Sequence, residues 1–67
     1  MNVRQFSIKY DVPQMLVYEA SYRCGDHTDF EPHEIAEQLR LIATERMATH
    51  QSRVDRCRKV LENIKDL

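Results

Sequence analysis

Apolar residues recur at helical spacing in two regions of this 67-residue chain, and polar segments separate these regions. In the first region one apolar-spaced run stops at Asp11, and a second begins after Pro13. Gly25, the only glycine, follows the second run and suits a helix end with positive φ. Residues 25 to 31 are typical of a polar loop, and Pro32 suits the first turn of a further helix. The pattern predicts a single small all-α domain.

The second region, residues 32 to 66, lacks glycine and consists mostly of good helix formers. Its apolar positions are three or four residues apart, which is close to the heptad pattern of a coiled coil. We call this row of positions the seam; it comprises Ile35, Leu39, Ala43, Met47, His50, Val54, Cys57, Leu61 and Ile64.

Two arrangements of residues 32 to 66 fit the seam. Its unbroken phase favours one helix of about 33 residues, which would span about 50 Å. Because the N-terminal half is too short to cover such a seam, this arrangement predicts a homodimer. The usual helix length of about 10 to 14 residues favours two antiparallel helices instead. The break would then fall at the weak helix formers Thr49 to Ser52, which include possible helix caps.

The segment FSIKYDVPQMLVYEASYR, residues 6 to 23, suits two short helices joined by a tight turn. Phe6 and Tyr10 are four residues apart and can face inward from the first helix. Ser7 is small enough to lie where the helices cross. Asp11 falls at the turn, and Asp is among the few non-glycine residues enriched in the left-handed region.

The second helix of this unit is expected to start at Pro13, where proline is well tolerated. Val17 and Ala20 are expected to face the core, and Leu16 to share that side. Val12 is expected to fill the space beside the turn. Each of these positions suits a helix-turn-helix.

Over residues 3 to 22 the pattern resembles the helix-turn-helix of small bacterial and phage DNA-binding proteins. A long dimerisation helix after the motif is similar in outline to the MerR-like regulators, but the wing of that family has no counterpart. The resemblance implies a dimeric, sequence-specific regulator of transcription whose second helix lies in the DNA major groove. It implies base contacts from Gln14, Met15, Tyr18 and Glu19. Phosphate contacts are expected from Arg4, Lys9, Arg23, Arg53 and Arg56.

The expected reading helix carries little positive charge, and this favours an alternative function. Of its outward residues only Gln14 is a typical base reader. Under the alternative, the chain is a small helical protein–protein interaction module, such as an adaptor, an antirepressor or an inhibitor, and its helical corner does not bind DNA. It would bind a partner through an exposed strip formed by Met15, Tyr18 and Tyr22, or through the seam.

Charge and composition limit the remaining classes. The net charge of −1 argues against a protein that coats nucleic acid without selectivity. No apolar run approaches the roughly 20 residues that a transmembrane helix needs, and the start of the chain lacks the apolar stretch of a signal peptide. These features predict a cytoplasmic protein without a membrane partner. Cys24 and Cys57 are then expected to be thiols.

Metal binding and catalysis find weak support. Cys24 and His27 have a plausible spacing for zinc, and His33 lies close by, but a second pair of ligands is missing. His33 and Glu37 share a helix face without the second histidine of a zinc protease. The chain also lacks a glycine-rich phosphate loop. The sequence therefore predicts no metal, no cofactor and no enzyme activity.

Overall fold

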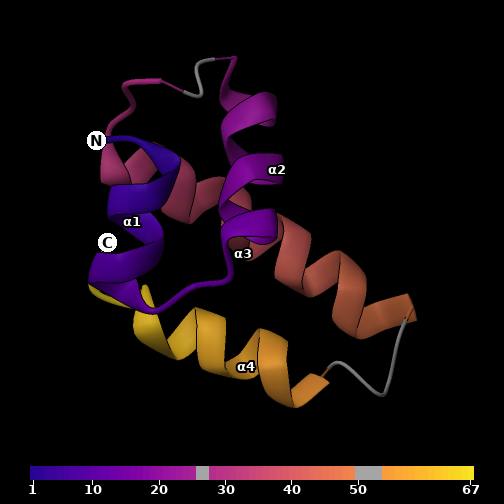
Figure 1. The fold of residues 1–67 in the computed structure, drawn as a ribbon. Coiled ribbons are helices and arrows are strands. Elements are labelled where there is room, and N and C mark those ends of the chain that lie inside the picture. The colour runs from indigo at the N-terminus through magenta and orange to yellow at the C-terminus, as the bar shows by residue number, and fades with distance from the viewer. Residues whose placement is uncertain (26–27, 50–53) are drawn as a thin grey trace.

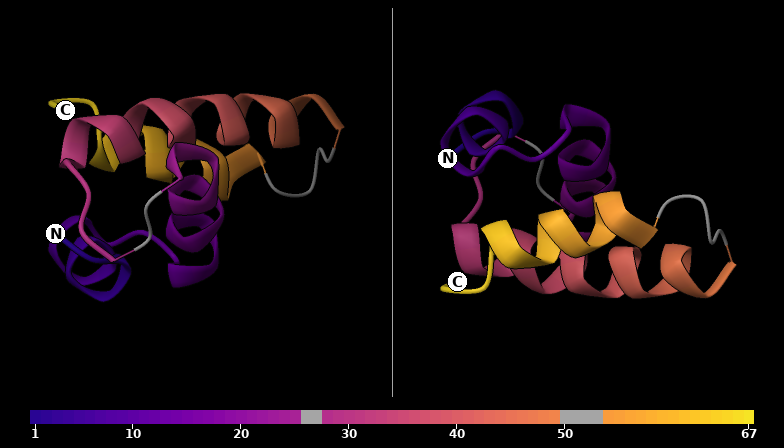
Figure 2. Two further views of the ribbon diagram at one scale, coloured as in Figure 1. Left: turned by 90° about the horizontal axis from the view of Figure 1, so that it is seen from above. Right: turned by 90° about the horizontal axis from the view of Figure 1, so that it is seen from below.

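The computed structural model describes residues 1–25, 28–49 and 54–67. Four helices follow one another along this part of the chain (Figure 1): α1 (Val3–Tyr10), α2 (Gln14–Cys24), α3 (Pro32–Thr49) and α4 (Val54–Asn63). Helices α3 and α4 form one layer, and α1 and α2 pack on the same side of it (Figure 2). The described residues contain no strand, so the all-α prediction is confirmed.

Helix α1 begins and ends at local signals in the sequence. At its start the Asn2 side chain accepts the backbone N–H of Gln5 at 2.9 Å, while the Gln5 side chain accepts the N–H of Asn2 at 3.0 Å. This reciprocal pair is a capping box. At its end Asp11 adopts φ 53° and ψ 54°, and its N–H donates to the carbonyl of Ser7. The expected left-handed conformation of Asp11 is confirmed.

Ser7 fastens the turn between α1 and α2. Its hydroxyl donates to the carbonyl of Val12 at 2.6 Å, and the N–H of Val12 donates back to the carbonyl of Ser7 at 3.2 Å. Val12 is only 2% exposed and fills the space beside the turn, as expected. Ser7 was expected at this position because of its small size. Its hydroxyl also stabilises the turn through a hydrogen bond.

The inner face of α2 packs against the rest of the domain. Leu16, Val17 and Ala20 are buried, which confirms the expected core-facing side. Ser21 is also fully buried, and its hydroxyl donates to the carbonyl of Tyr18 at 2.6 Å. A buried polar group that is hydrogen-bonded costs little. The helix ends before Gly25, whose φ of 83° matches the expected helix end.

A loop residue contributes to the core in a way that the sequence did not indicate. Phe30 lies in the segment expected to be a polar loop, yet it is 4% exposed. Its ring meets Phe6 edge to face at a centroid distance of 6.1 Å. The N–H of Phe30 donates to the carbonyl of Met1 at 2.9 Å, and the amino terminus pairs with Asp29 at 2.9 Å. The loop therefore holds the start of the chain in place.

The prediction of one long C-terminal helix is wrong, and the antiparallel hairpin is correct. Helix α3 ends at Thr49, and α4 begins at Val54 and runs back along α3 (Figures 1 and 2). The guanidinium of Arg40 in α3 donates to the carbonyl of Ile64 just after α4, at 3.3 Å. An even spacing of apolar residues does not distinguish one helix from two that face each other, because both arrangements place these residues on one side.

The seam is covered within one chain. Ile35, Leu39, Ala43, Cys57 and Ile64 are buried, and Met47, Val54 and Leu61 are half-buried. Thr49, where the expected helix break at Thr49 to Ser52 begins, is the last residue of α3, whereas His50 and the rest of that break lie outside the described residues. Since the seam shares one core with buried residues of α1 and α2, and α3 packs against α4, the seam no longer requires a second copy. The homodimer stays a prediction, but an uncovered seam no longer supports it.

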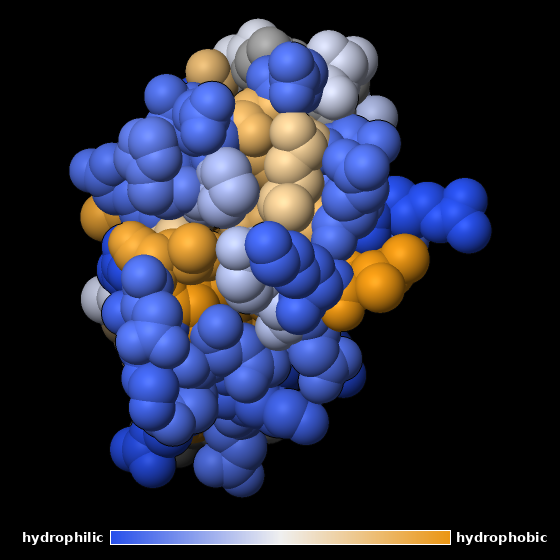
Figure 3. Space-filling model, turned by 90° about the vertical axis from the view of Figure 1, so that its left-hand side faces the viewer, coloured by the Kyte–Doolittle hydropathy of each residue, from blue (hydrophilic) through white to orange (hydrophobic). Residues whose placement is uncertain are grey.

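Apolar side chains remain exposed at several places on the surface. On the side of the molecule where both chain ends lie, hydrophilic side chains surround separate apolar patches (Figure 3). Among the described residues, the large apolar side chains that remain exposed are Ile8, Met15, Tyr18, Tyr22 and Leu41. Most of them belong to α2, so the outward side of this helix is the candidate binding surface. No helix in the described ranges has both the length and the apolar character of a membrane span.

Candidate functional site

The outward face of α2 carries an uncharged strip. Met15 is 85% exposed, Tyr18 45% and Tyr22 62%. They are spaced three and four residues apart, so they follow one another along one side of the helix. Gln14, the first residue of α2, is exposed beside them. The structure thus brings together Gln14, Met15 and Tyr18, three of the predicted base-contact residues, and adds Tyr22.

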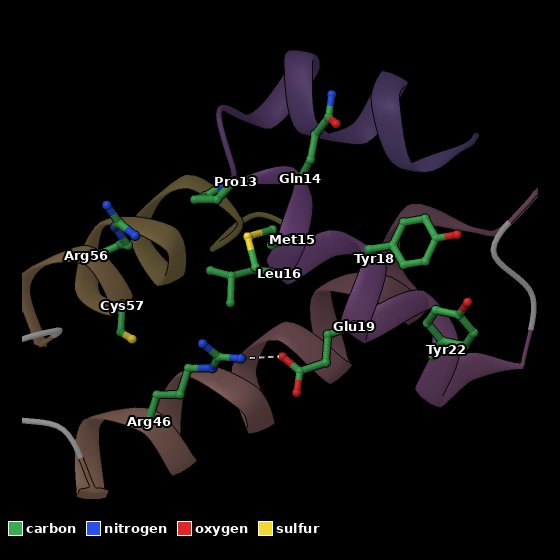
Figure 4. Close-up of a pocket in the computed structure, with 10 residues that line it drawn as sticks. All are labelled: Pro13, Gln14, Met15, Leu16, Tyr18, Glu19, Tyr22, Arg46, Arg56 and Cys57. Carbon is green, nitrogen blue, oxygen red and sulfur yellow. Dashed lines mark hydrogen bonds and ion pairs between the residues drawn. The ribbon is translucent and has the colours of Figure 1, made fainter.

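Glu19, the fourth predicted base-contact residue, does not belong to this strip. Its carboxylate accepts a hydrogen bond from the guanidinium of Arg46 in α3, at 2.5 Å, and the side chain is half-buried (Figure 4). The pair neutralises a charge that would otherwise repel a nucleic acid. Glu19 therefore ties α2 to α3, and its role as a base contact stays a prediction. The sequence did not reveal this, because Arg46 is 27 residues away.

Arg23, a predicted phosphate contact, is also paired. Its guanidinium donates to both carboxylate oxygens of Glu45 in α3, at 3.0 and 3.3 Å. The hydrogen bond with Glu45 raises the pKa of Arg23, and the same bond lowers the pKa of Glu45. The positive charge of Arg23 is consequently balanced by a neighbouring negative charge, so it attracts phosphate less than a free arginine would.

Tyr18 and Tyr22 form one aromatic unit. Their ring centroids are 5.1 Å apart and the rings are inclined by 56°. A hydrogen bond with Tyr18 raises the pKa of Tyr22, so the Tyr22 phenol is neutral at ordinary pH. Tyrosine offers a large apolar area together with a polar tip, which suits contacts with either a protein or a nucleic acid.

A groove of about 760 Å³ runs beside this strip, between α2, the end of α3 and the start of α4 (Figure 4). Cys57 and Leu16 are the deeply placed apolar residues, whereas Met15 stands out from α2. Arg56 comes from the α4 side and Arg46 from α3. The sequence could not indicate this groove, because it exists only when α4 folds back. The lining consists of Pro13, Gln14, Met15, Leu16, Tyr18, Glu19, Tyr22, Arg46, Arg56 and Cys57.

Basic side chains of α4 lie near the beginning of α2. Arg56 and Lys59 share with Val12 and Pro13 the lining of a second, smaller hollow of about 360 Å³. The ammonium of Lys59 is 3.9 Å from the carboxylate of Asp11, a loose and exposed pair. The exposed α4 side chains thus bring positive charge to the turn. Only Arg56 among them was a predicted phosphate contact.

The other predicted phosphate contacts are dispersed. Arg4 and Lys9 are exposed on α1, where the ammonium of Lys9 lies 5.4 Å from the ring centre of Tyr10. Arg53 lies outside the described residues. Of the predicted phosphate contacts that the structure describes, Arg56 is the one that lines the hollow at the start of α2.

The cysteine and histidine residues near the loop do not form a described metal site. The thiol of Cys24 donates to the carbonyl of Glu34 at 3.6 Å, and burial, followed by the charges of Glu34 and Glu37, raises its pKa. His33 is exposed, and His27 lies outside the described residues. Within the part of the chain that the structure describes, no three potential ligands come together. Cys24 and Cys57 are free thiols.

The site is thus a tight turn, an outward strip on α2, a groove beside it and two basic side chains of α4. Its residues come from three helices, and α2 supplies most of them. No family model, curated protein or solved structure matches the chain. The assignment of a function therefore rests on the geometry and charge of this surface.

Proposed function

We propose that the protein binds DNA sequence-specifically and reads it with α2. The turn is the observation that supports this proposal most strongly. After the left-handed Asp11, the first residues of α2 are exposed and lie next to Arg56 and Lys59 of α4. A helix-turn-helix requires this combination of an outward reading helix and nearby positive charge. The function is regulation of transcription of the phage, plasmid or bacterial type.

The chemistry of α2 suits the base edges of a major groove. The Gln14 amide can donate to and accept from adenine at the same time. Met15 and Tyr18 provide apolar surface for a thymine methyl group. The first N–H groups of a helix have no partner within it and point toward an approaching phosphate. In α2 these groups belong to Gln14 and Met15, because the N–H groups of Leu16 and Val17 donate to the carbonyl of Pro13.

The charges on this surface set the expected strength of binding. Arg23 and Arg46 are paired with Glu45 and Glu19. Among the described residues, Arg56 and the loosely paired Lys59 are the cations that line the hollow at the start of α2. Two to four phosphate contacts per chain would give a slope of about −2 to −4 in log affinity against log salt. The protein should therefore depend on base contacts more than a strongly basic regulator does.

Selection from a random duplex library tests the proposal, because it needs no knowledge of the operator. We expect an enriched motif that contains adenine, bound more tightly than a scrambled duplex in fluorescence anisotropy. Gln14→Ala should weaken binding by about 1 to 3 kcal/mol and relax the preference at one position. Arg56→Ala should weaken binding to every duplex and make the salt slope shallower by about 1.

Arg58→Ala is the matched control, since Arg58 is an exposed arginine of the same helix that lines neither hollow. It should bind almost like the parent chain. If no motif is enriched at low salt, or if Arg56→Ala and Arg58→Ala behave alike, α2 is not a reading helix.

The same selection examines the dimer. Two copies related by a two-fold axis would enrich inverted half-sites whose centres are about 10 base pairs apart. We expect such repeats. A single uninterrupted motif would show that one copy binds alone.

A further inference from the structure

We propose that the groove between α2, α3 and α4 also binds an amphipathic helix of another protein, one whose apolar side is flanked by carboxylates. This proposal goes beyond DNA binding and does not depend on it. The recognition mode is a helix in a groove, in which a few apolar anchors enter a hollow and charges at its edges set the orientation.

The apolar part of the groove fits such an anchor. Its volume of about 760 Å³ lies within the range of about 300–1,000 Å³ that is typical of binding pockets and leaves room for large apolar side chains. Leu16 is 8% and Cys57 2% exposed, so they form a firm base, whereas Met15 is 85% exposed and can move to cover an incoming group. Methionine adapts its shape easily and is common at surfaces that bind varied helices.

The charges at the groove select the carboxylates. Arg46 and Arg56 both line it, and its one carboxylate, Glu19, is already held by Arg46. Arg56 is exposed, and none of the ion pairs among the described residues includes it. The groove therefore has a surplus of one positive charge, and an acidic helix complements it where a basic helix is repelled.

A helix bound in this groove would compete with DNA for the outward face of α2. Met15 and Tyr18 line the groove and also belong to the face that we propose for base contacts. A helix seated there covers both side chains, so the two ligands should exclude each other. An acidic partner of this kind would act as an inhibitor of DNA binding.

The experiment is a selection of displayed helical peptides on the immobilised full chain, in the absence of DNA. Peptides are randomised among Leu, Phe, Ala, Ser, Glu and Lys. We expect enriched peptides to carry apolar residues at helical spacing and more Glu than Lys. In anisotropy titrations with the best peptide, Arg56→Glu should weaken binding about tenfold or more, and Met15→Ala several-fold.

Arg58→Glu controls for net charge and should change the affinity less than about twofold. Circular dichroism of each variant shows that it is folded. The proposal is overturned if no peptide is enriched, if Glu and Lys are enriched equally, or if Arg56→Glu and Arg58→Glu weaken binding alike. It is also overturned if light scattering shows self-association that Arg56→Glu abolishes, because the occupant is then a second copy. Peptide binding without any DNA binding would refute only the proposed function.

Discussion

The corner formed by α1 and α2 and the hairpin formed by α3 and α4 are specified in different ways. The corner depends on single residues: Asn2 caps its first helix, Asp11 makes the turn and Gly25 ends the second helix. The hairpin depends on a repeat of apolar positions, which defines a buried side but not what covers it. Local signals therefore fix where a chain turns, whereas periodicity leaves open whether a helix meets its own chain or another.

The largest effect is expected from the core beneath the corner. Phe6 is fully buried and its ring lies 4.6 Å from that of Tyr10, centroid to centroid. Phe6→Ala should lower the free energy of unfolding by about 3–5 kcal/mol, enough to unfold much of so small a domain. Urea unfolding followed by circular dichroism measures it. If helix content persists with a separate transition, the corner and the hairpin fold independently.

A similar substitution in the hairpin probes the other side of the comparison. Ile64 is fully buried just after α4, so Ile64→Ala should cost about 2–5 kcal/mol. Because the seam is covered within one chain, the loss of stability caused by Ile64→Ala should be the same at low and at high protein concentration. A loss that changes with concentration would mean that a second copy covers the seam.

The stability of the turn should depend more on the backbone conformation of Asp11 than on its charge. Asp11 has φ 53°, where a side chain other than Asn or Asp is strained. Asp11→Ala should destabilise by about 1 kcal/mol, whereas Asp11→Gly should be neutral or slightly stabilising. Both remove the carboxylate that lies near Lys59, so the pair separates the two causes. Equal losses of stability would assign the effect to the charge.

The smallest effect is expected where the two regions meet at the surface, in the Arg23–Glu45 pair. The pKa of Glu45 is lowered in the folded chain, so its contribution to stability is present above its ordinary pKa. That contribution is lost as the pH falls through the lowered value. Glu45→Gln should therefore shift the melting temperature slightly at pH 7 and not at all in strong acid. A difference that grows toward acid would contradict the assigned pairing.

These contrasts explain how much the sequence could predict. Leu16, Val17 and Ala20 were placed correctly because helical periodicity determines which residues share a side. The ion-pair partners of Glu19 and Arg23 could not be predicted in the same way, because both partners lie in α3, far along the chain.

The groove and the burial of Phe30 depend on packing between distant segments. Phe30 is an isolated apolar residue among polar ones, and its contact with Phe6 joins the loop to α1, which lies far away along the chain. The groove needs Arg56 and Cys57 of α4 next to α2, which requires the hairpin. Neither feature has a local signal in the sequence.

The proposal that α2 reads DNA is tested most directly by amide NMR spectra of the full chain during titration with a short duplex at low salt. We expect the largest shifts at Gln14, Met15 and Leu16, with smaller ones at Arg56 and Lys59 of α4. Raising the salt should reverse them. Unchanged spectra, or shifts confined to α1 and the outer side of α3, would contradict the account.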